Sequence, residues 1–270
     1  MSHPGPIGMF DSGIGGLSVL AAARSALPGE SFVYLADQAS FPYGPRSAAA
    51  VRVLSERAAR VLLEEGAKVI VVACNTASAH ALAHLRRTFD VPFVGLVPAV
   101  KPAALQTHSG VVAVLATEGT LGGALFHAVR REFANGVRVL ELAANGLASA
   151  IERGGPWAAE TEDLLAGYCC DVRRSGADVV VLGCTHYGFV RRRAQELLGD
   201  DVAILDTADA VARQLAHVVA EHRLAAPPGG PSAVRLLTTG SVGDLRRTVE
   251  ALERAGGLPS LGAEYAEVRV

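Results

Sequence analysis

The sequence contains two closely similar nine-residue segments, GAKVIVVAC from Gly66 and GADVVVLGC from Gly176. Each is a short run of β-branched and aliphatic residues that ends on a cysteine, Cys74 in the first segment and Cys184 in the second. Uninterrupted apolar runs of this length are typical of strands buried in a parallel sheet. Because the two segments align without a gap, they predict equivalent strands in two similar parts of the chain.

Other apolar runs alternate with Ala-, Arg-, Leu- and Glu-rich helical stretches, as in PIGMFD, SFVYLAD, AKVIVVAC and VPFVGLV. This alternation indicates βαβ units around a parallel sheet with helices on both faces. A second pair, VPFVGLVPAV and VAILDTADAV, shares its first Val and its final Ala-Val and supports the internal repeat. We therefore expect an α/β fold with two similar parallel-sheet domains, related by a pseudo-twofold axis, and an active site in the cleft between them.

The repeat also suggests where the domains divide. We expect residues 1–98 together with 208–270 to form the first domain, and residues 99–207 to form the second. After LDTADAV the chain would return to the first domain, supply helices and close its sheet with AVRLLTTG. The Pro/Gly-rich stretch LAAPPGGPS is expected to be a surface loop.

Composition limits the classes of function. Of 270 residues, 50% are hydrophobic, and the formal net charge is -2, which favours neither nucleic acid nor a membrane surface as a partner. The beginning, MSHPGPIGMFDSG, has no basic region followed by a long apolar run, and no apolar stretch reaches the roughly 18 residues of a spanning helix. These features predict a cytoplasmic protein.

The chain has four cysteines, which we expect to be reduced thiols rather than a disulfide framework. Cys169 and Cys170 lie in TEDLLAGYCCDVRRSG, whose helical apolar spacing predicts core or boundary positions of a helix. No Cys-x-x-Cys spacing occurs, which disfavours both a metal site and a redox dithiol. Cys74 and Cys184 remain as candidates for catalytic chemistry. The alternative interpretation is that each is only a small, buried apolar residue.

Ligands of parallel α/β sheets bind outside the carboxyl ends of the strands, where both repeated cysteines lie. We expect backbone N–H groups and the following helix to lower the pKa of each thiol, so that it can act as a base. Two thiols on opposite faces of one carbon allow one to remove a proton while the other delivers one. That arrangement would invert a stereocentre, and the reverse reaction would use the same groups with their roles exchanged.

Several motifs occur in an order similar to that of a known family: FDSGIGGLSVL at Phe10, FPYGPRS at Phe41, ACNTASA at Ala73, TEGT at Thr117 and LGCTHY at Leu182. Together with RLLTTGS at Arg235, they spread over most of the chain. The sequence resembles the aspartate/glutamate racemase superfamily, and within it the glutamate racemases. The resemblance implies interconversion of L- and D-glutamate without a cofactor, supplying D-glutamate for peptidoglycan.

The resemblance also implies roles for individual residues. Cys74 and Cys184 match the two proton-transfer cysteines, Asp11 and His186 match residues that assist them, and Glu152 matches a carboxylate near the second thiol. A further set matches positions that hold the substrate together with Asp11 and His186: Ser12, Tyr43, Gly44, Asn75, Thr76, Thr117, Thr120 and Thr185.

Each of these side chains also has a purely structural interpretation. Asp11 or Ser12 could cap a helix, and the threonines of TEGT could do the same. The segment around Tyr43 could be a turn without a chemical role. His186 could be a hydrogen-bonded core histidine, and Glu152 a solvated helix residue.

Three positions depart from the family pattern. The segment ELAANGLASAIERG keeps Glu152 but lacks the usual Cys-Pro and the following proline, Gln38 stands where a Thr is usual, and Gly188 stands where a Pro is usual. The first departure predicts a smaller contribution from Glu152 than from Asp11 or His186.

Pyridoxal phosphate would need a Schiff-base lysine, and only Lys68 and Lys101 are present, neither of them well placed. Hydrogen bonds from DSG, CNT and CTH would then have to stabilise a carbanion. The alternatives are a racemase of aspartate or another acid, a decarboxylase, and a non-catalytic two-domain ligand-binding protein. A decarboxylase of the superfamily needs one cysteine, so the pair argues against it. By resemblance, a homodimer is also expected.

Overall fold

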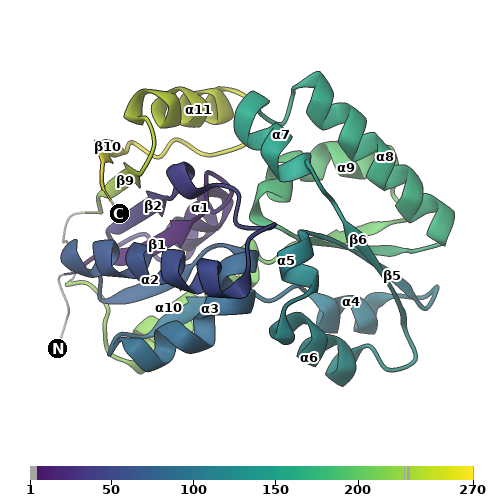
Figure 1. Ribbon diagram of the computed structural model, residues 1–270, viewed down its shortest axis with the longest axis horizontal. Helices are drawn as coiled ribbons and strands as arrows, with labels where there is room; N and C mark the ends of the chain where they lie inside the picture. The colour runs from purple at the N-terminus through teal and green to yellow at the C-terminus, as the bar shows by residue number, and fades with distance from the viewer. Residues whose placement is uncertain (1–4, 228, 230–231, 270) are drawn as a thin grey trace.

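The computed structural model describes residues 5–227, 229 and 232–269. Residues 1–4, residue 270 and part of the stretch 224–232, which was predicted to be a surface loop, lie outside the described residues. Two parallel sheets organise the described ranges, and helices cover both faces of each sheet (Figure 1). The predicted α/β class is confirmed.

The first sheet has six parallel strands in the order β10-β9-β2-β1-β3-β4. Its strands are β1 (Ile7–Asp11), β2 (Phe32–Ala36), β3 (Val69–Val72), β4 (Phe93–Gly95), β9 (Val234–Thr238) and β10 (Glu264–Glu267). Alternate strand residues face opposite cores, as a pleated backbone requires. Met9 and Val71 pack with α1 (Leu17–Ala26), α10 (Ala208–Glu221) and α11 (Val242–Arg254). Phe10 and Val72 pack with α2 (Ala48–Glu64) and α3 (Asn75–Thr88).

The second sheet has four parallel strands in the order β6-β5-β7-β8. Its strands are β5 (Val111–Ala116), β6 (Arg138–Ala143), β7 (Val179–Gly183) and β8 (Ala203–Leu205). One face carries α4 (Val100–Gln106), α5 (Glu118–Leu121) and α6 (Ala124–Phe133). The other face carries α7 (Leu147–Gly154), α8 (Ala159–Ser175) and α9 (Arg191–Leu198). The 3-10 helices η1 (Gln38–Ser40) and η2 (Thr185–Val190) follow β2 and β7.

The two sheets share one pattern of strands. The order β2-β1-β3-β4 in the first corresponds to β6-β5-β7-β8 in the second, so β3 and β7, the strands of the sequence repeat, take equivalent places. The glycines that open the repeat, Gly66 and Gly176, have φ of 79° and 75°. A residue with a side chain is strained at such angles, which explains why both copies begin with glycine where a helix turns into a strand.

The C-terminal part of the chain lies in the first sheet, beyond β2. The segment AVRLLTTG contains β9, which was expected to close the sheet, but β9 is an interior strand. The edge is β10, a strand that the sequence analysis missed because EYAE is short, carries two glutamates and has no apolar run. The boundaries 1–98, 99–207 and 208–270 remain predictions. No helix among the described residues has the length and apolar character needed to cross a lipid bilayer.

The cysteines outside the repeat lie on α8. Cys169 is buried in the core beneath α7, α8 and α9, as its helical spacing predicted, whereas its neighbour Cys170 is exposed. All four cysteines are free thiols.

Candidate active site

A cavity of about 370 Å³ lies where the carboxyl ends of the strands of both sheets meet. It gathers most of the residues that the sequence singled out: Asp11, Ser12, Tyr43, Gly44, Cys74, Asn75, Thr76, Thr117, Cys184, Thr185 and His186. Glu152 and Thr120 do not line it. Glu152 lies behind His186, and Thr120 lies behind Thr76 and Thr117.

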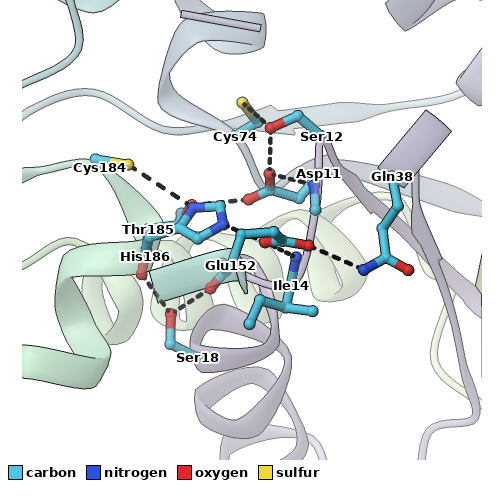
Figure 2. A network of polar contacts seen from close by, with 12 residues as sticks. Asp11, Ser12, Ile14, Ser18, Gln38, Cys74, Glu152, Cys184, Thr185 and His186 are labelled. Atoms are coloured by element: carbon cyan, nitrogen blue, oxygen red, sulfur yellow. Dashed lines mark hydrogen bonds and ion pairs between the residues drawn. The ribbon is translucent and has the colours of Figure 1, made fainter. Parts of the chain in front are cut away.

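The two repeated thiols enter this cavity from different sheets (Figure 2). Cys74 follows β3 and immediately precedes α3, and Cys184 follows β7 and precedes η2. Each thiol has a polar neighbour of its own: the Ser12 hydroxyl lies 4.0 Å from the Cys74 sulfur, and Nδ1 of His186 lies 3.9 Å from the Cys184 sulfur. We call each sheet together with its helices one half of the molecule: the six-stranded sheet belongs to the first half and the four-stranded sheet to the second. Each half therefore contributes one thiol and one polar neighbour of that thiol to the cavity.

Asp11 connects the two halves at the wall of the cavity. The carboxylate is completely buried, and its Oδ1 accepts hydrogen bonds from the Ser12 hydroxyl at 3.0 Å and the Gly13 N–H at 3.2 Å. Its Oδ2 accepts a hydrogen bond of 2.7 Å from the Thr185 hydroxyl in the second half. Burial raises the pKa of Asp11, and the positive charge of His186 together with these hydrogen bonds opposes the rise.

The pKa of Cys74 differs from the prediction. We expected the turn into α3 to lower it, but burial, followed by the negative charge of Asp11, raises it above the usual range. Backbone N–H groups of Ala77 and Ser12 act in the expected direction and are outweighed. The expectation was wrong for this residue because a sequence pattern shows the helix start but not the depth of burial. The raised pKa favours the neutral form of the Cys74 thiol, which is suited to donate a proton.

Glu152 and His186 form an ion pair behind the second thiol. Nε2 of His186 donates to Oε2 of Glu152 at 2.6 Å, and the side chains are 2% and 10% exposed. Burial acts to raise the pKa of Glu152, but the hydrogen bond and charge of His186, with donors from Gln38 and Ile14, lower it. Burial acts to lower the pKa of His186, but hydrogen bonds to Cys184 and Glu152 and the charge of Glu152 raise it well above its usual value. Glu152 therefore contacts His186 directly, and its smaller contribution relative to Asp11 and His186 remains a prediction.

Three threonines form a cluster of hydroxyls, two of which, Thr76 and Thr117, line the cavity. The hydroxyls of Thr76 and Thr117 are 2.8 Å apart, those of Thr117 and Thr120 are 3.0 Å apart, and those of Thr76 and Thr120 are 3.4 Å apart. Thr117 also caps α5, because its hydroxyl accepts from the Thr120 N–H at 3.2 Å. Thr117 therefore both caps α5 and lines the cavity.

The Tyr43–Gly44 segment lines the cavity through a fixed turn. The Tyr43 hydroxyl donates to Oδ2 of Asp37 at 2.6 Å, and burial together with the charge of Asp37 raises its pKa far above the usual range. The Gly44 carbonyl accepts from the Gly119 N–H at 3.1 Å, and a side chain at Gly119 would lie only 2.7 Å from that carbonyl. This contact ties the first half to α5.

The Asn75 side chain is a candidate ligand group. It is 4% exposed and lines the cavity, yet neither its Oδ1 nor its Nδ2 has a hydrogen-bond partner within the described chain. A buried amide without partners is costly, by about 1–3 kcal/mol for each unsatisfied group. The amide is thus available to both an ammonium and a carboxylate of a small ligand.

Several residues that line the cavity were not predicted from the sequence: Phe41, Pro42, Pro45, Glu118, Ala144, Asn145, Gly146, Ala148 and Ser149. Asn145 donates to Oε1 of Glu118 at 2.8 Å, linking the turn after β6 to the start of α5, which follows β5. The rule that ligands lie at carboxyl strand ends could have indicated both of these segments, but AANGLAS carries no family motif. Phe41 packs against the His186 ring with 5.5 Å between centroids.

The described residues that line the cavity include no lysine or arginine. Lys68 is buried in an ion pair with Glu30, 2.5 Å between Nζ and Oε2, and Lys101 lies over the Phe133 ring. In the described ranges, no group of three or more His, Cys, Asp and Glu side chains could hold a metal ion. Anionic groups of a ligand would therefore be held by amides, hydroxyls and backbone N–H groups, including those at the start of α3.

The ion pair predicts a pH-dependent stability. The pKa of Glu152 is depressed below 4.5, so its contribution is present above that pH and is lost as pH falls through the folded value. The pKa of His186 is raised above 6.5, so its contribution is complete below that pH and is lost as pH rises through the folded value. His186→Asn should therefore lower stability most between pH 4.5 and 6.5, by about 3 kcal/mol, or roughly 6–12 °C in Tm.

The control for that experiment is His217→Asn, because His217 forms only an exposed contact of 3.7 Å with Glu221. Thermal unfolding of both variants across the pH range should separate them. A difference between His186→Asn and the unsubstituted chain that stays constant with pH would contradict the ion-pair assignment.

Each of the two parallel β-sheets brings one thiol and one polar partner to the same cavity. This arrangement defines the active site of an α/β enzyme that is built around two sheets. A family model described as Asp/Glu/Hydantoin racemase matches residues 17–215. The chain is 48% identical over 266 residues to the glutamate racemase of Roseiflexus sp. (strain RS-1), covering 98% of this chain and 97% of that protein. The chain belongs to the Asp/Glu/Hydantoin racemase family.

Solved structures agree with this assignment. The glutamate racemase isoform RacE1 of Bacillus anthracis matches with a TM-score of 0.84 at 29% identity, over 98% of each chain. The Escherichia coli glutamate racemase, solved in complex with L-glutamate and the activator UDP-MurNAc-ala, matches with a TM-score of 0.84 at 32% identity, over 99% of each chain. The resemblance noted from the motifs is thus confirmed, as is the expected two-domain parallel-sheet architecture.

Proposed function

We propose that this protein is a glutamate racemase that interconverts L- and D-glutamate by proton transfer at Cα between two thiols. The observation that carries the proposal is the placement of Cys74 and Cys184, from equivalent strand ends of two sheets, in one cavity. High identity to curated glutamate racemases over nearly the whole chain supports glutamate as the substrate.

In the proposed mechanism, one cysteine removes the Cα proton as a thiolate while the other, as a neutral thiol, protonates the opposite face. Burial and the charge of Asp11 raise the pKa of Cys74 and so favour its neutral thiol. The ammonium of a bound amino acid would offset the charge of Asp11 and favour the Cys74 thiolate. Asn75, with both amide atoms unpartnered, supplies contacts for the ammonium or the carboxylate.

The companion thiol, Cys184, has its own proton carrier. His186 lies 3.9 Å from the sulfur through Nδ1, and its ring is held on the other side by Glu152. A protonated imidazole beside a sulfur stabilises a thiolate and can return the proton. No lysine or arginine is among the described residues that line the cavity. The negative charge that develops on the substrate would therefore be stabilised by uncharged hydrogen-bond donors in the turns that follow the strands.

We expect the purified protein to racemise glutamate in both directions without added pyridoxal phosphate or metal, and to be unaffected by a chelator or a carbonyl reagent. A chiral assay on L- and D-glutamate and on L- and D-aspartate measures this. Turnover of aspartate without turnover of glutamate would transfer the assignment to the alternative racemase. Ligand binding without turnover of either acid would favour a non-catalytic binding protein.

The cellular role and assembly are further parts of the proposal. D-glutamate made by this reaction would serve peptidoglycan synthesis, and the expected location is the cytoplasm. A homodimer is expected from the family resemblance, and sedimentation of the purified chain measures it.

A further inference from the structure

We propose that Gln38 is a positioning residue that holds Glu152, and through it His186, in place for proton transfer at Cys184. This inference rests on the proposed racemase function. It concerns a hydrogen bond between Gln38 and Glu152, residues that are far apart in the sequence.

Gln38 lies at the start of η1, directly after β2 and its following residue Asp37, in the first half of the molecule. Its Nε2 donates a hydrogen bond of 2.9 Å to Oε1 of Glu152, which belongs to α7 in the second half. Figure 2 shows the Gln38 amide facing the Glu152 carboxylate from the side opposite His186. The contact therefore crosses from one half of the molecule to the other.

The orientation of the Gln38 amide is fixed by a second contact. The Thr238 hydroxyl on β9 lies 2.8 Å from Oε1 of Gln38, and its oxygen accepts the Gly240 N–H at 2.9 Å. Because the Thr238 oxygen accepts from Gly240, its proton is free to point at Oε1 of Gln38. The NH2 group of Gln38 is thereby directed to Glu152. Thr238 itself is completely buried, so bulk water does not compete for its hydroxyl.

Glu152 has little freedom once these contacts are made. Its Oε2 accepts from the Ile14 N–H at 3.0 Å and from Nε2 of His186 at 2.6 Å, while Oε1 accepts from Gln38. Gly13 leaves the carboxylate room, since a side chain there would lie 2.5 Å from Oε2. Among these donors, only Gln38 is a side chain that can be replaced without altering the backbone or the His186 ring.

The chain of contacts runs from Thr238 through Gln38, Glu152 and His186 to Cys184, and it ends at that thiol. The hydrogen-bonding neighbour of Cys74 is Ser12, which is held by Asp11 rather than by Glu152. Loss of the Gln38 amide should therefore impair the step at Cys184 more than the step at Cys74. A merely structural role of Gln38 in η1 would affect both steps alike.

The test compares three variants. Gln38→Met keeps the length of the side chain and removes its amide. Gln38→Glu keeps an acceptor for Thr238 and places a carboxylate against Glu152. Gln106→Met is the control, because Gln106 is an exposed residue at the end of α4. We expect Gln38→Met to lower kcat about tenfold, Gln38→Glu to lower it further, and the control to match the unsubstituted chain.

The decisive readout is the primary isotope effect on kcat with glutamate deuterated at Cα, measured separately for each enantiomer. In a two-base reaction the deuterium is removed by one cysteine only, so each enantiomer reports one step. In Gln38→Met the effect should rise for the enantiomer whose proton Cys184 removes and fall for the other. Equal changes for both enantiomers, or none, would overturn the inference.

A second readout needs no turnover. Loss of a donor destabilises the ionised carboxylate, so the pKa of Glu152 should rise by about one pH unit in Gln38→Met. Titration of ¹³C-labelled glutamate carboxyls, with Glu152→Gln to assign the signal, measures it. The other titratable groups facing the pair, Asp11 on β1, Tyr34 on β2 and Cys184 after β7, are the same in all variants.

These readouts separate the two proposals. An unsubstituted protein that does not racemise glutamate contradicts the proposed function, and the Glu152 titration still tests the positioning role. An unchanged titration in Gln38→Met overturns the positioning role, even in a protein that racemises glutamate. In Gln38→Glu, activity relative to the unsubstituted chain should recover as pH falls, because a protonated carboxyl can again donate to Glu152.

Discussion

Replacing either cavity thiol by a hydroxyl, in Cys74→Ser or Cys184→Ser, is expected to lower the rate of glutamate racemisation by about 10³-fold or more. A serine hydroxyl is a much weaker acid than a thiol, so it can neither form the required anion near neutral pH nor release its proton as readily. In the proposed mechanism, each cysteine serves once as base and once as acid in the reversible reaction. Neither variant can therefore retain a fast pathway in one direction.

The two variants should nevertheless differ in their half-reactions. The family resemblance assigns removal of the proton of D-glutamate to Cys74 and that of L-glutamate to Cys184. A substrate analogue with a leaving group on Cβ can lose HX after proton removal alone, without a proton donor on the far face. Cys74→Ser should eliminate preferentially from the L-isomer, and Cys184→Ser from the D-isomer.

The matched control is Cys170→Ser, because Cys170 is an exposed thiol on α8. It should keep the rates of the unsubstituted protein for both racemisation and elimination. The opposed two-base mechanism is wrong for this protein if both active-site variants prefer the same enantiomer. It is also wrong if either variant racemises at the unsubstituted rate.

Gly15→Ala is expected to lower kcat by about 100-fold without preventing folding. A side chain at Gly15 would lie 2.5 Å from the Thr185 hydroxyl, 2.8 Å from Cε1 of His186 and closer still to its Nδ1. The imidazole cannot keep its place between Cys184 and Glu152 against such a contact, because atoms at this distance overlap. The substitution thus acts on the proton carrier of the second thiol rather than on the thiol itself.

Gly29→Ala provides the comparison, since a side chain at Gly29 would meet no atom within 4 Å and its backbone is not left-handed. Rates of racemisation in both directions, together with thermal unfolding, separate a local displacement from a general loss of structure. A Gly15→Ala protein with the unsubstituted kcat would show that the position of His186 is not critical.

Sequence patterns predicted the parts of the fold that depend on local periodicity. The apolar runs that became β3 and β7 are uninterrupted, and the left-handed glycines Gly66 and Gly176 mark where each begins. The strand β10 was missed because its segment EYAE, at the sheet edge, has no such run. Edge strands are half solvated, and their sequences carry little of the signal of a buried strand.

Some features of the candidate site could likewise be predicted from local sequence, and others could not. Cys74 and Cys184 were found because each follows its strand directly, and strand ends converge in parallel sheets. The link between Gln38 and Glu152 joins residues 114 positions apart on different halves, and no local pattern encodes it. The raised pKa of Cys74 was missed for a related reason, because burial and the nearness of Asp11 are properties of the assembled halves.

The interior position of β9 in the first sheet has a consequence for how the protein is made. The strands of the four-stranded sheet are contiguous in sequence, from β5 to β8, so a nascent chain can complete that sheet once residue 205 has left the ribosome. The six-stranded sheet must wait until β9 and β10 have been synthesised, and the edge of β2 stays open until then. Thr238, the anchor of Gln38, arrives with β9. The order of translation therefore makes the second thiol's support the last part of the site to assemble.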